Sequence, residues 1–179
     1  MIITAQQFIE KWNKSKLKER SASQSHFIDL CHLLNHPDPV SADPEGAWYT
    51  FEYGAQKTTG SQGFADVWKK GHFGWEYKGK HKDLQAAYAQ LQQYAPALAN
   101  PPLLIVCDTD RFIIYTNWND LVSETHEIAL EDLANPDKLN LLRNAFFEPD
   151  KLKPSKSRQQ LTEEVAGKFA TISEKLRQR

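Results

Sequence analysis

The stretch GFADVWKKGHFGWEYKGK, residues 63–80, places acids and lysines inside two short apolar segments. F-A-D-V-W and F-G-W-E-Y-K are rich in aromatic and β-branched residues, which favour strands, and K-K-G-H between them predicts a tight turn. Two strands joined by so short a connection predict an antiparallel hairpin. Charged side chains inside strands cost stability unless they form ion pairs or serve a function such as metal binding. The presence of Asp66, Glu76 and Lys78 therefore needs an explanation.

The spacing of these three residues suggests a metal site. Glu76 and Lys78 are two residues apart, so on a strand they point to the same face. If Asp66 points to that face from the paired strand, two carboxylates offer the hard oxygen ligands that Mg²⁺ prefers, and the lysine can orient or help deprotonate a water. Tyr77 would point the other way, which leaves its backbone carbonyl as a further ligand. The alternative is a hairpin with cross-strand ion pairs on a solvated face.

Two amphipathic helices are predicted before the hairpin. Thr4 can cap the first, and the second covers residues 21–35. The three prolines and one glycine of residues 36–47 predict a surface loop, and the aromatic run 48–53 predicts a strand. T-T-G-S-Q-G, residues 58–63, predicts a turn or flexible loop. The apolar stripes of the helices are Phe8, Ile9 and Trp12 in the first and Phe27, Leu30, Cys31 and Leu34 in the second.

Alternation of helix and strand continues after the hairpin. Residues 83–98 predict a helix, which the two prolines after Asn100 end. L-L-I-V-C-D predicts a strand buried on both faces, and F-I-I-Y-T-N-W a further strand. I-A-L-E-D-L, residues 128–133, and residues 137–147 predict short helices. Together with the earlier elements, these segments predict five strands and several helices.

This order of elements predicts an α/β (α+β) fold, with one mixed β-sheet flanked by helices and a C-terminal helical extension. We expect one domain over residues 1–150, followed over 151–179 by a linker, from E-P-D-K-L-K-P-S-K-S, and the start of a helical connector. The apolar residues of that last helix share one face and need a partner: Leu161, Val165, Phe169, Ile172 and Leu176.

Composition excludes several classes of protein. The 179 residues carry a net charge of −1, so any surface that binds nucleic acid must be local. The N-terminus is no signal peptide, and no apolar run approaches the length of a membrane helix. Cys31 and Cys107 lie in apolar surroundings, which favours buried reduced thiols and a cytoplasmic protein. No Cys/His cluster suggests zinc.

The motif D-x9-E-x-K, on strand–turn–strand before a helix, resembles that of PD-(D/E)XK nucleases. Gln90 and Tyr94 on that helix are similar to the QxxxY motif of RecB-type members, and both lie on a flank of its apolar stripe. The ordered run E-R-S-x-x-Q-S-H-F-I-D-L-C, G-F-A-D-V-W, Q-L-Q-Q-Y and N-P-P-L-L-I-V-C-D-T-D-R resembles the N-terminal nuclease domain of MmeI-like restriction–modification enzymes. The resemblance covers roughly residues 15–120 and implies a restriction-endonuclease-like fold.

The resemblance implies a DNA endonuclease that depends on Mg²⁺, with Mn²⁺ as a substitute. Asp66, Glu76 and the Tyr77 carbonyl would bind the metal, Lys78 would activate the water, and Gln90 would support the site. An acid from the first helices completes the metal shell in many relatives, and Glu19 is the candidate, with Asp29 as its rival. An ordinary helix-start carboxylate is the alternative for both. Two residues of the second helix, Gln24 and His26, are expected to face the same cleft.

Residues 54–82 hold six lysines against two acids, a local charge of +4 in a nearly neutral chain. We expect weak, salt-sensitive contacts with the phosphates of double-stranded DNA; a solvated charge cluster is the alternative. The lysines assigned to DNA binding, besides Lys78, are Lys57, Lys69, Lys70, Lys80 and Lys82. His72 and His81 are expected at exposed turn and helix-start positions, with DNA contact as a secondary role.

The family joins its nuclease to a helical connector, a methyltransferase and a target-recognition domain, and these are the implied partners, together with dimerisation for cleavage. N-P-P-L, residues 100–103, resembles an amino-methyltransferase motif but has Leu103 where an aromatic residue is needed. No glycine-rich loop suggests an S-adenosylmethionine site in this chain. Two alternatives stay open: a catalytically silent DNA-binding or assembly module with the nuclease fold, and a repair or recombination nuclease of that fold.

Overall fold

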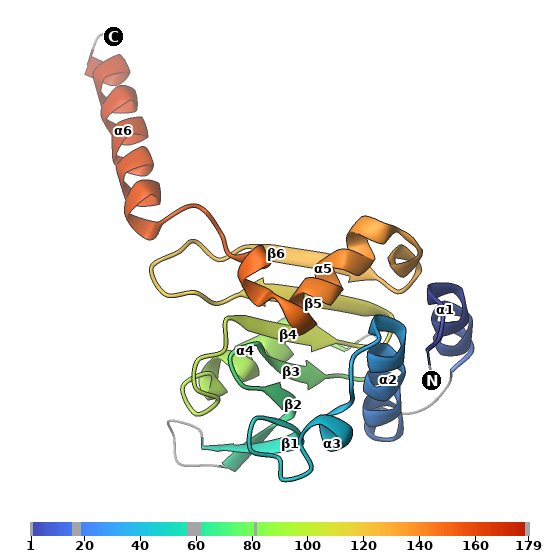
Figure 1. Ribbon diagram of the computed structural model, residues 1–179. Coiled ribbons are helices and arrows are strands. Elements are labelled where there is room, and N and C mark those ends of the chain that lie inside the picture. The colour runs from blue at the N-terminus through green and yellow to red at the C-terminus, as the bar shows by residue number, and fades with distance from the viewer. Residues whose placement is uncertain (1, 16–18, 57–61, 81, 178–179) are drawn as a thin grey trace.

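The computed structural model describes residues 2–15, 19–56, 62–80 and 82–177. A six-stranded mixed sheet with sequential order β1-β2-β3-β4-β5-β6 forms the centre. Only β3 and β4 are parallel, and helix α4 connects them; the other neighbours are antiparallel. Figure 1 shows α1, α2 and α5 on one face of the sheet and α4 on the other. This arrangement confirms the predicted fold class.

The strands are β1 (Tyr49–Gln56), β2 (Gln62–Lys69), β3 (Phe73–Tyr77), β4 (Leu103–Cys107), β5 (Arg111–Thr116) and β6 (Thr125–Ala129). The α-helices are α1 (Ala5–Lys14), α2 (Glu19–Leu34), α3 (Pro39–Ala42), α4 (Leu84–Tyr94), α5 (Pro136–Phe147) and α6 (Arg158–Arg177). Two short 3₁₀ helices are η1 (Glu131–Ala134) and η2 (Pro149–Leu152). No described helix has the length and apolar character to cross a membrane.

The local signals in the sequence account for most of these elements. The Thr4 hydroxyl accepts a hydrogen bond from the Gln7 N–H, and the Thr4 N–H donates to Gln7 Oε1, a capping box that begins α1. Asp83 caps α4 through the backbone N–H groups of Gln85 and Ala86. The helix ends at Tyr94, and turn residues continue to the prolines. All five residues of β4 are buried, as their continuous apolar run predicts.

Two hydrophobic clusters pack on the two faces of the sheet. The larger one joins the predicted stripes of α1 and α2 to β3, β5 and α5, and Trp75 and Phe146 lie at its centre. The smaller one packs α4 against Trp68, Leu104 and Val106. Cys31 and Cys107 are buried and reduced, as predicted. The sheet is therefore covered on both faces.

Two predictions for irregular segments were wrong. Residues 36–47 are not entirely a loop, because Asp38 caps the short helix α3 and Pro39 occupies its first position. I-A-L-E-D-L is not a helix: its first two residues end β6, and a 3₁₀ turn follows. β6 is an edge strand that forms because it pairs with β5. Among its residues only Ile128 is buried. The sheet has six strands instead of five.

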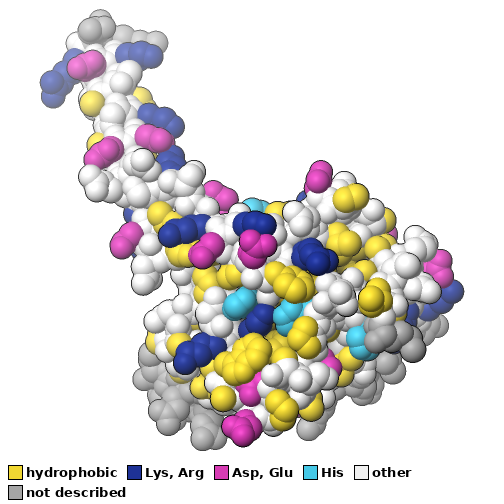
Figure 2. Space-filling view, viewed as in Figure 1, with side chains coloured by type: hydrophobic (Ala, Val, Ile, Leu, Met, Phe, Trp, Pro, Cys, Tyr) yellow, Lys and Arg dark blue, Asp and Glu magenta, His cyan; other side chains and the backbone are white. Residues whose placement is uncertain are grey.

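The C-terminal segment differs from its prediction in part. The predicted linker contains η2, and the side chains of Leu152 and Pro154 are buried against the domain. Helix α6 then projects from the body of the molecule (Figure 1). The predicted apolar face of α6 is exposed along its whole length; Phe169 is 66% exposed and Leu176 is 68% exposed. Figure 2 shows hydrophobic side chains scattered along the surface of the projecting helix.

Candidate active site

The acid of β2 lies where β2 and β3 separate. The two strands pair only over residues 67–69 and 73–75, and the same register would place Asp66 opposite Glu76. Asp66 Oδ2 instead accepts a hydrogen bond of 2.6 Å from the backbone N–H of Tyr77. The Asp66 carboxylate thus takes the place of a backbone acceptor in the β2–β3 ladder. Its donor, Tyr77, directly follows Glu76 in the chain.

The acid of β3 points toward α4. Glu76 is 5% exposed, and its Oε1 accepts hydrogen bonds from Lys78 Nζ at 2.8 Å and from Gln90 Nε2 at 2.9 Å. Gln90 comes from the middle of α4, so the packing of that helix on the sheet brings the predicted pair together. Tyr94, one turn later, is buried under α4. A lysine and an amide thus hold the Glu76 carboxylate in one orientation.

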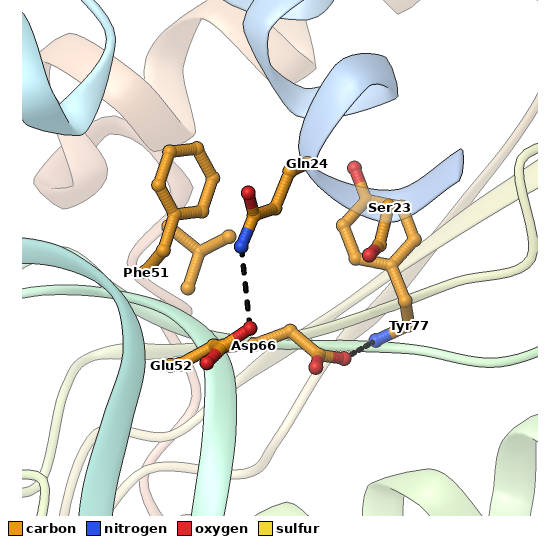
Figure 3. A pocket seen from close by; sticks show the side chains of 7 residues that line it. Ser23, Gln24, Phe51, Glu52, Asp66 and Tyr77 are labelled. Carbon is orange, nitrogen blue, oxygen red and sulfur yellow. Dashed lines mark hydrogen bonds between the residues drawn. The ribbon is translucent and has the colours of Figure 1, made fainter. Parts of the chain in front are cut away.

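A small cavity opens beside Asp66 on the α2 side of the sheet. Its volume is about 10 Å³, which is room for one water-sized species. Figure 3 shows the carboxylate of Asp66 next to the backbone nitrogen of Tyr77, with Gln24 reaching in from α2. Asp66 therefore borders this cavity, whereas Glu76 is held from the α4 side. The lining residues are Ser23, Gln24, Phe51, Glu52, Asp66, Val67 and Tyr77.

Glu52 is an acid of this cavity that sequence reasoning missed. The pairs on either side of it in β1 place it opposite Asp66, but these two residues do not form a pair. Its φ of 52° is left-handed, which is rare for a non-glycine residue in a strand and costs backbone energy. Gln24 Nε2 donates a 3.2 Å hydrogen bond to Glu52 Oε1. The sequence signal was weak: one acid in an aromatic strand.

His26 differs from its prediction, because it does not face the cleft. It is fully buried, and its Nδ1 lies 2.8 Å from the hydroxyl of Tyr77. Burial, with the charges of Lys80 and Lys11, lowers the pKa of His26 to about 3, so the ring is neutral at pH 7. The contact joins α2 to the end of β3, and His26 therefore helps to hold Tyr77 in place. Gln24 alone of the two reaches the cavity.

The two candidates for a third acid are in different positions. Asp29 pairs with Lys11 at 2.6 Å and accepts a hydrogen bond from Trp12 Nε1, so it joins α2 to α1. Glu19 is the first residue of α2, four residues before Ser23, and its side chain is outside the described part of the structure. Within the described residues, no three His, Cys, Asp or Glu side chains are grouped so that they could hold a metal ion.

Comparison with known proteins assigns the chain to a family. The family model "MmeI, N-terminal domain" matches residues 3–179, which is nearly the whole chain. The chain belongs to the MmeI N-terminal domain family. No curated protein matches it. A cryo-electron microscopy structure of a DrdV–DNA complex is similar at 16% sequence identity with a TM-score of 0.46, and the match covers 80% of this chain and 14% of that chain.

The lysines of this MmeI N-terminal domain are not gathered around the two acids. Lys78, Lys80 and Lys82 follow the end of β3, and of these Lys78 contacts Glu76, at 2.8 Å. Lys70 is exposed on the hairpin turn, at the opposite end of β3, roughly 13 Å away along the strand. Lys57 and His81 lie outside the described residues. His72 is on the same turn as Lys70 and contacts its backbone carbonyl at 3.1 Å.

The prediction that Lys69 faces DNA was wrong. Lys69 is 6% exposed, and its Nζ donates to the Phe146 carbonyl at 2.6 Å and lies 2.9 Å from His36 Nε2. Burial lowers the pKa of Lys69 to about 8, and burial with the Lys69 charge lowers the pKa of His36 to about 4. Lys69 follows Val67 by two residues, so the strand alternation already directed it toward the core. It joins β2 to α5.

Proposed function

We propose that this chain is the Mg²⁺-dependent DNA endonuclease domain of a restriction–modification enzyme, of the PD-(D/E)XK type. Membership of the MmeI N-terminal domain family supports this function. The observation that carries it is the hydrogen bond from the Tyr77 N–H to Asp66, where β2 and β3 separate, directly beside the Glu76–Lys78–Gln90 group. The residues of the motif thus lie near the end of the hairpin where the strands separate, with Asp66 on the α2 side of the sheet and Glu76 held from the α4 side.

The oxygen groups at this end suit a hard divalent cation. Mg²⁺ is commonly bound through one or two carboxylates and keeps several waters, so a complete protein cage is unnecessary. Asp66 and Glu76 would supply the carboxylates. The N–H and C=O of a strand residue point to the same side, so the Tyr77 carbonyl would be directed toward Asp66. Glu19 remains a candidate for a further acidic ligand. When bound, the metal would lower the pKa of a water and offset phosphate charge.

Lys78 and Gln90 have separate tasks in this proposal. Lys78 Nζ is within hydrogen-bond distance of Glu76 and is 24% exposed, so a phosphate or water at the site can reach it. It would orient the attacking water and stabilise the negative charge that develops on the phosphorane. Gln90 is a positioning residue, because it holds Glu76 through a neutral donor. The water would attack phosphorus, break the bond to the 3′ oxygen and leave a 5′-phosphate.

The implied partners follow from the same proposal. Double-stranded DNA would contact Lys78, Lys80 and Lys82 at the end of β3 through its phosphates, which provides affinity but little sequence information. Sequence choice would then come from connector, methyltransferase and target-recognition domains of the parent polypeptide. Dimerisation before cleavage belongs to the proposal as well.

The test is cleavage of duplex DNA by the parent polypeptide in the presence of Mg²⁺. Asp66→Asn and Lys78→Met should each lower the cleavage rate at least 100-fold, because each removes a group required at the reacting phosphate. Asp137→Asn is a matched control, since it removes one exposed acid at the start of α5 and should cut as the wild type does. Wild-type cleavage by Asp66→Asn or Lys78→Met would refute the assignment.

A catalytically silent module is the second candidate. The observation that favours it is the lack, in the described residues, of any three potential ligand side chains grouped for a metal ion. Mn²⁺ titration of the 179-residue chain, followed by electron paramagnetic resonance, separates the two. A nuclease should bind Mn²⁺ in a manner that Asp66→Asn and Glu76→Gln abolish, and a silent module should not.

A further inference from the structure

The parallel strands β3 and β4 bring a lysine and an acid together beside the proposed site. Their last pair is Tyr77 with Cys107, and the N–H of Lys78 still donates to the Cys107 carbonyl at 2.8 Å. Lys80 and Asp110 each stand three residues beyond that pair, in the segments that follow β3 and β4. Their side chains form an ion pair with a distance of 2.6 Å between Nζ and Oδ1. The parallel register thus starts the two segments side by side, and the ion pair forms two residues after Lys78.

The backbone holds Asp110 firmly in its position. Asp108 is 2% exposed, and its Oδ1 accepts hydrogen bonds from the N–H groups of Asp110 and Arg111 at 3.2 and 2.8 Å. Thr109 between them has a left-handed φ of 69°, which makes the turn tight. The Asp110 carbonyl accepts a 2.7 Å bond from Leu130 N–H. The carboxylate that meets Lys80 is thus part of a fixed turn.

The ion pair itself is easy to exchange. The side chains of Lys80 and Asp110 are 29% and 35% exposed, so water screens their attraction. A DNA phosphate carries the same charge as a carboxylate and has the same kind of acceptor oxygens. It can replace Asp110 as the partner of Lys80 without moving either backbone. Asp110 then lies near the bound phosphate and repels it.

We propose that Asp110 is an internal substitute for a DNA phosphate: it holds Lys80 in the free domain and yields it to the backbone of bound duplex. The inference rests on the proposed function and adds to it a control of DNA affinity. A fixed acid next to the phosphate-binding lysine keeps non-specific binding weak. The domain then stays on DNA only where other contacts add to the affinity, which is what a nuclease without its own sequence reader requires.

The experiment measures binding of the 179-residue chain to a non-specific DNA duplex by fluorescence anisotropy, at about 50 mM salt and without divalent metal, so that no cleavage occurs. Asp110→Asn should lower the dissociation constant about 3- to 10-fold, because it removes the repulsion and the negative charge that competes with the phosphate for Lys80. The amide in this variant keeps the shape of the side chain and can still accept a hydrogen bond from Lys80. The gain should shrink as salt rises, because screening weakens the repulsion.

Two controls isolate the contact. Glu148→Gln breaks the exposed pair with Lys151, at 2.9 Å, and changes the net charge by the same amount at another place; it should leave the affinity nearly unchanged. Lys80→Met should weaken DNA binding. The double variant Lys80→Met/Asp110→Asn should regain little of the lost affinity. An equal gain from Asp110→Asn and Glu148→Gln would overturn the proposal, as would an undiminished gain in the Lys80→Met background. Thermal unfolding of each variant verifies that it is folded.

The outcome also distinguishes this inference from the proposed function. If the wild type binds DNA and Asp110→Asn has the same dissociation constant, the role of Asp110 is rejected and the nuclease proposal is unaffected. If neither the wild type nor any variant shows salt-sensitive DNA binding, two ideas are rejected: the role of Asp110, and DNA contact by the lysines after β3. Cleavage by the parent polypeptide with Asp66→Asn remains the separate test of the catalytic site.

Discussion

His26 allows a quantitative prediction about acid stability. The folded chain keeps its ring neutral, because burial together with the charges of Lys80 and Lys11 lowers the pKa of His26 to about 3. In the unfolded chain an imidazole titrates near a pKa of about 6.5. As the pH falls from 7 to 5, the unfolded state gains a proton at this position and the folded state does not. The free energy of unfolding must therefore decrease over this range.

The size of the decrease depends little on the folded pKa. Any value well below 5 gives the same result, since the folded ring takes up almost no proton above pH 5. Linkage then gives a loss of about 2 kcal/mol between pH 7 and pH 5 for one such histidine. The loss is complete only when the pH reaches the folded pKa. His36, whose pKa is also lowered, acts in the same direction.

The variant His26→Asn tests this reasoning. Asparagine does not titrate and can still bond the Tyr77 hydroxyl, although it loses ring contacts with Phe8, Trp12 and Phe112. We expect a lower stability at pH 7, by roughly 1–3 kcal/mol, but a loss between pH 7 and pH 5 that is about 2 kcal/mol smaller than in the wild type.

Urea unfolding followed by circular dichroism at the two pH values provides the measurement. Phe27→Leu is the control, because it damages the same buried helix face without changing any titrating group. It should lower stability equally at both pH values. If His26→Asn loses as much stability between pH 7 and pH 5 as the wild type does, His26 is not a buried neutral ring and the reasoning is refuted.

Two further predictions concern β1 and β2. The lowered pKa of Lys69 means that the folded state releases a proton above pH 8 while the unfolded state keeps it until about pH 10. Stability should therefore rise by about 1–2 kcal/mol from pH 8 to pH 10, after allowance for solvent screening, and Lys69→Met should abolish that rise in urea titrations. At Glu52 the left-handed φ should make Glu52→Gly more stable than Glu52→Ala by about 1 kcal/mol. At Thr50 of the same strand the order should be reversed, and the same order at both positions would show that Glu52 is unstrained.

Local chemistry made much of this fold predictable. Thr4 and Asp83 cap the residues next to them in the chain, so the starts of α1 and α4 could be located from the sequence. The end of α4 could not, because the helix stops at Tyr94, before the prolines that were expected to end it. The apolar run of β4 and the hairpin of β2 and β3 were also clear. β6 was not, because its residues are mostly polar and it forms by pairing with β5.

The sequence by itself determined which chemical groups stand close to the hairpin: an acid on β2, an acid and a lysine on β3, and an amide on the helix that follows. Spacing is enough for this, because alternation along a strand and the turn between strands are local. The tertiary structure alone decided what those groups contact. The separation of β2 from β3 turns Asp66 to the Tyr77 N–H, and the packing of α4 brings Gln90 to Glu76.

Elements distant in the sequence likewise determined which partner each charged side chain contacts. Phe146 of α5 removes Lys69 from the surface, and the parallel register of β3 and β4 places Asp110 against Lys80. These partners are 77 and 30 residues away in the chain, so no local pattern encodes them. The sequence alone does not show whether a lysine contacts a carbonyl, a carboxylate or DNA. The packing of the sheet and helices determines which of these partners its side chain can reach.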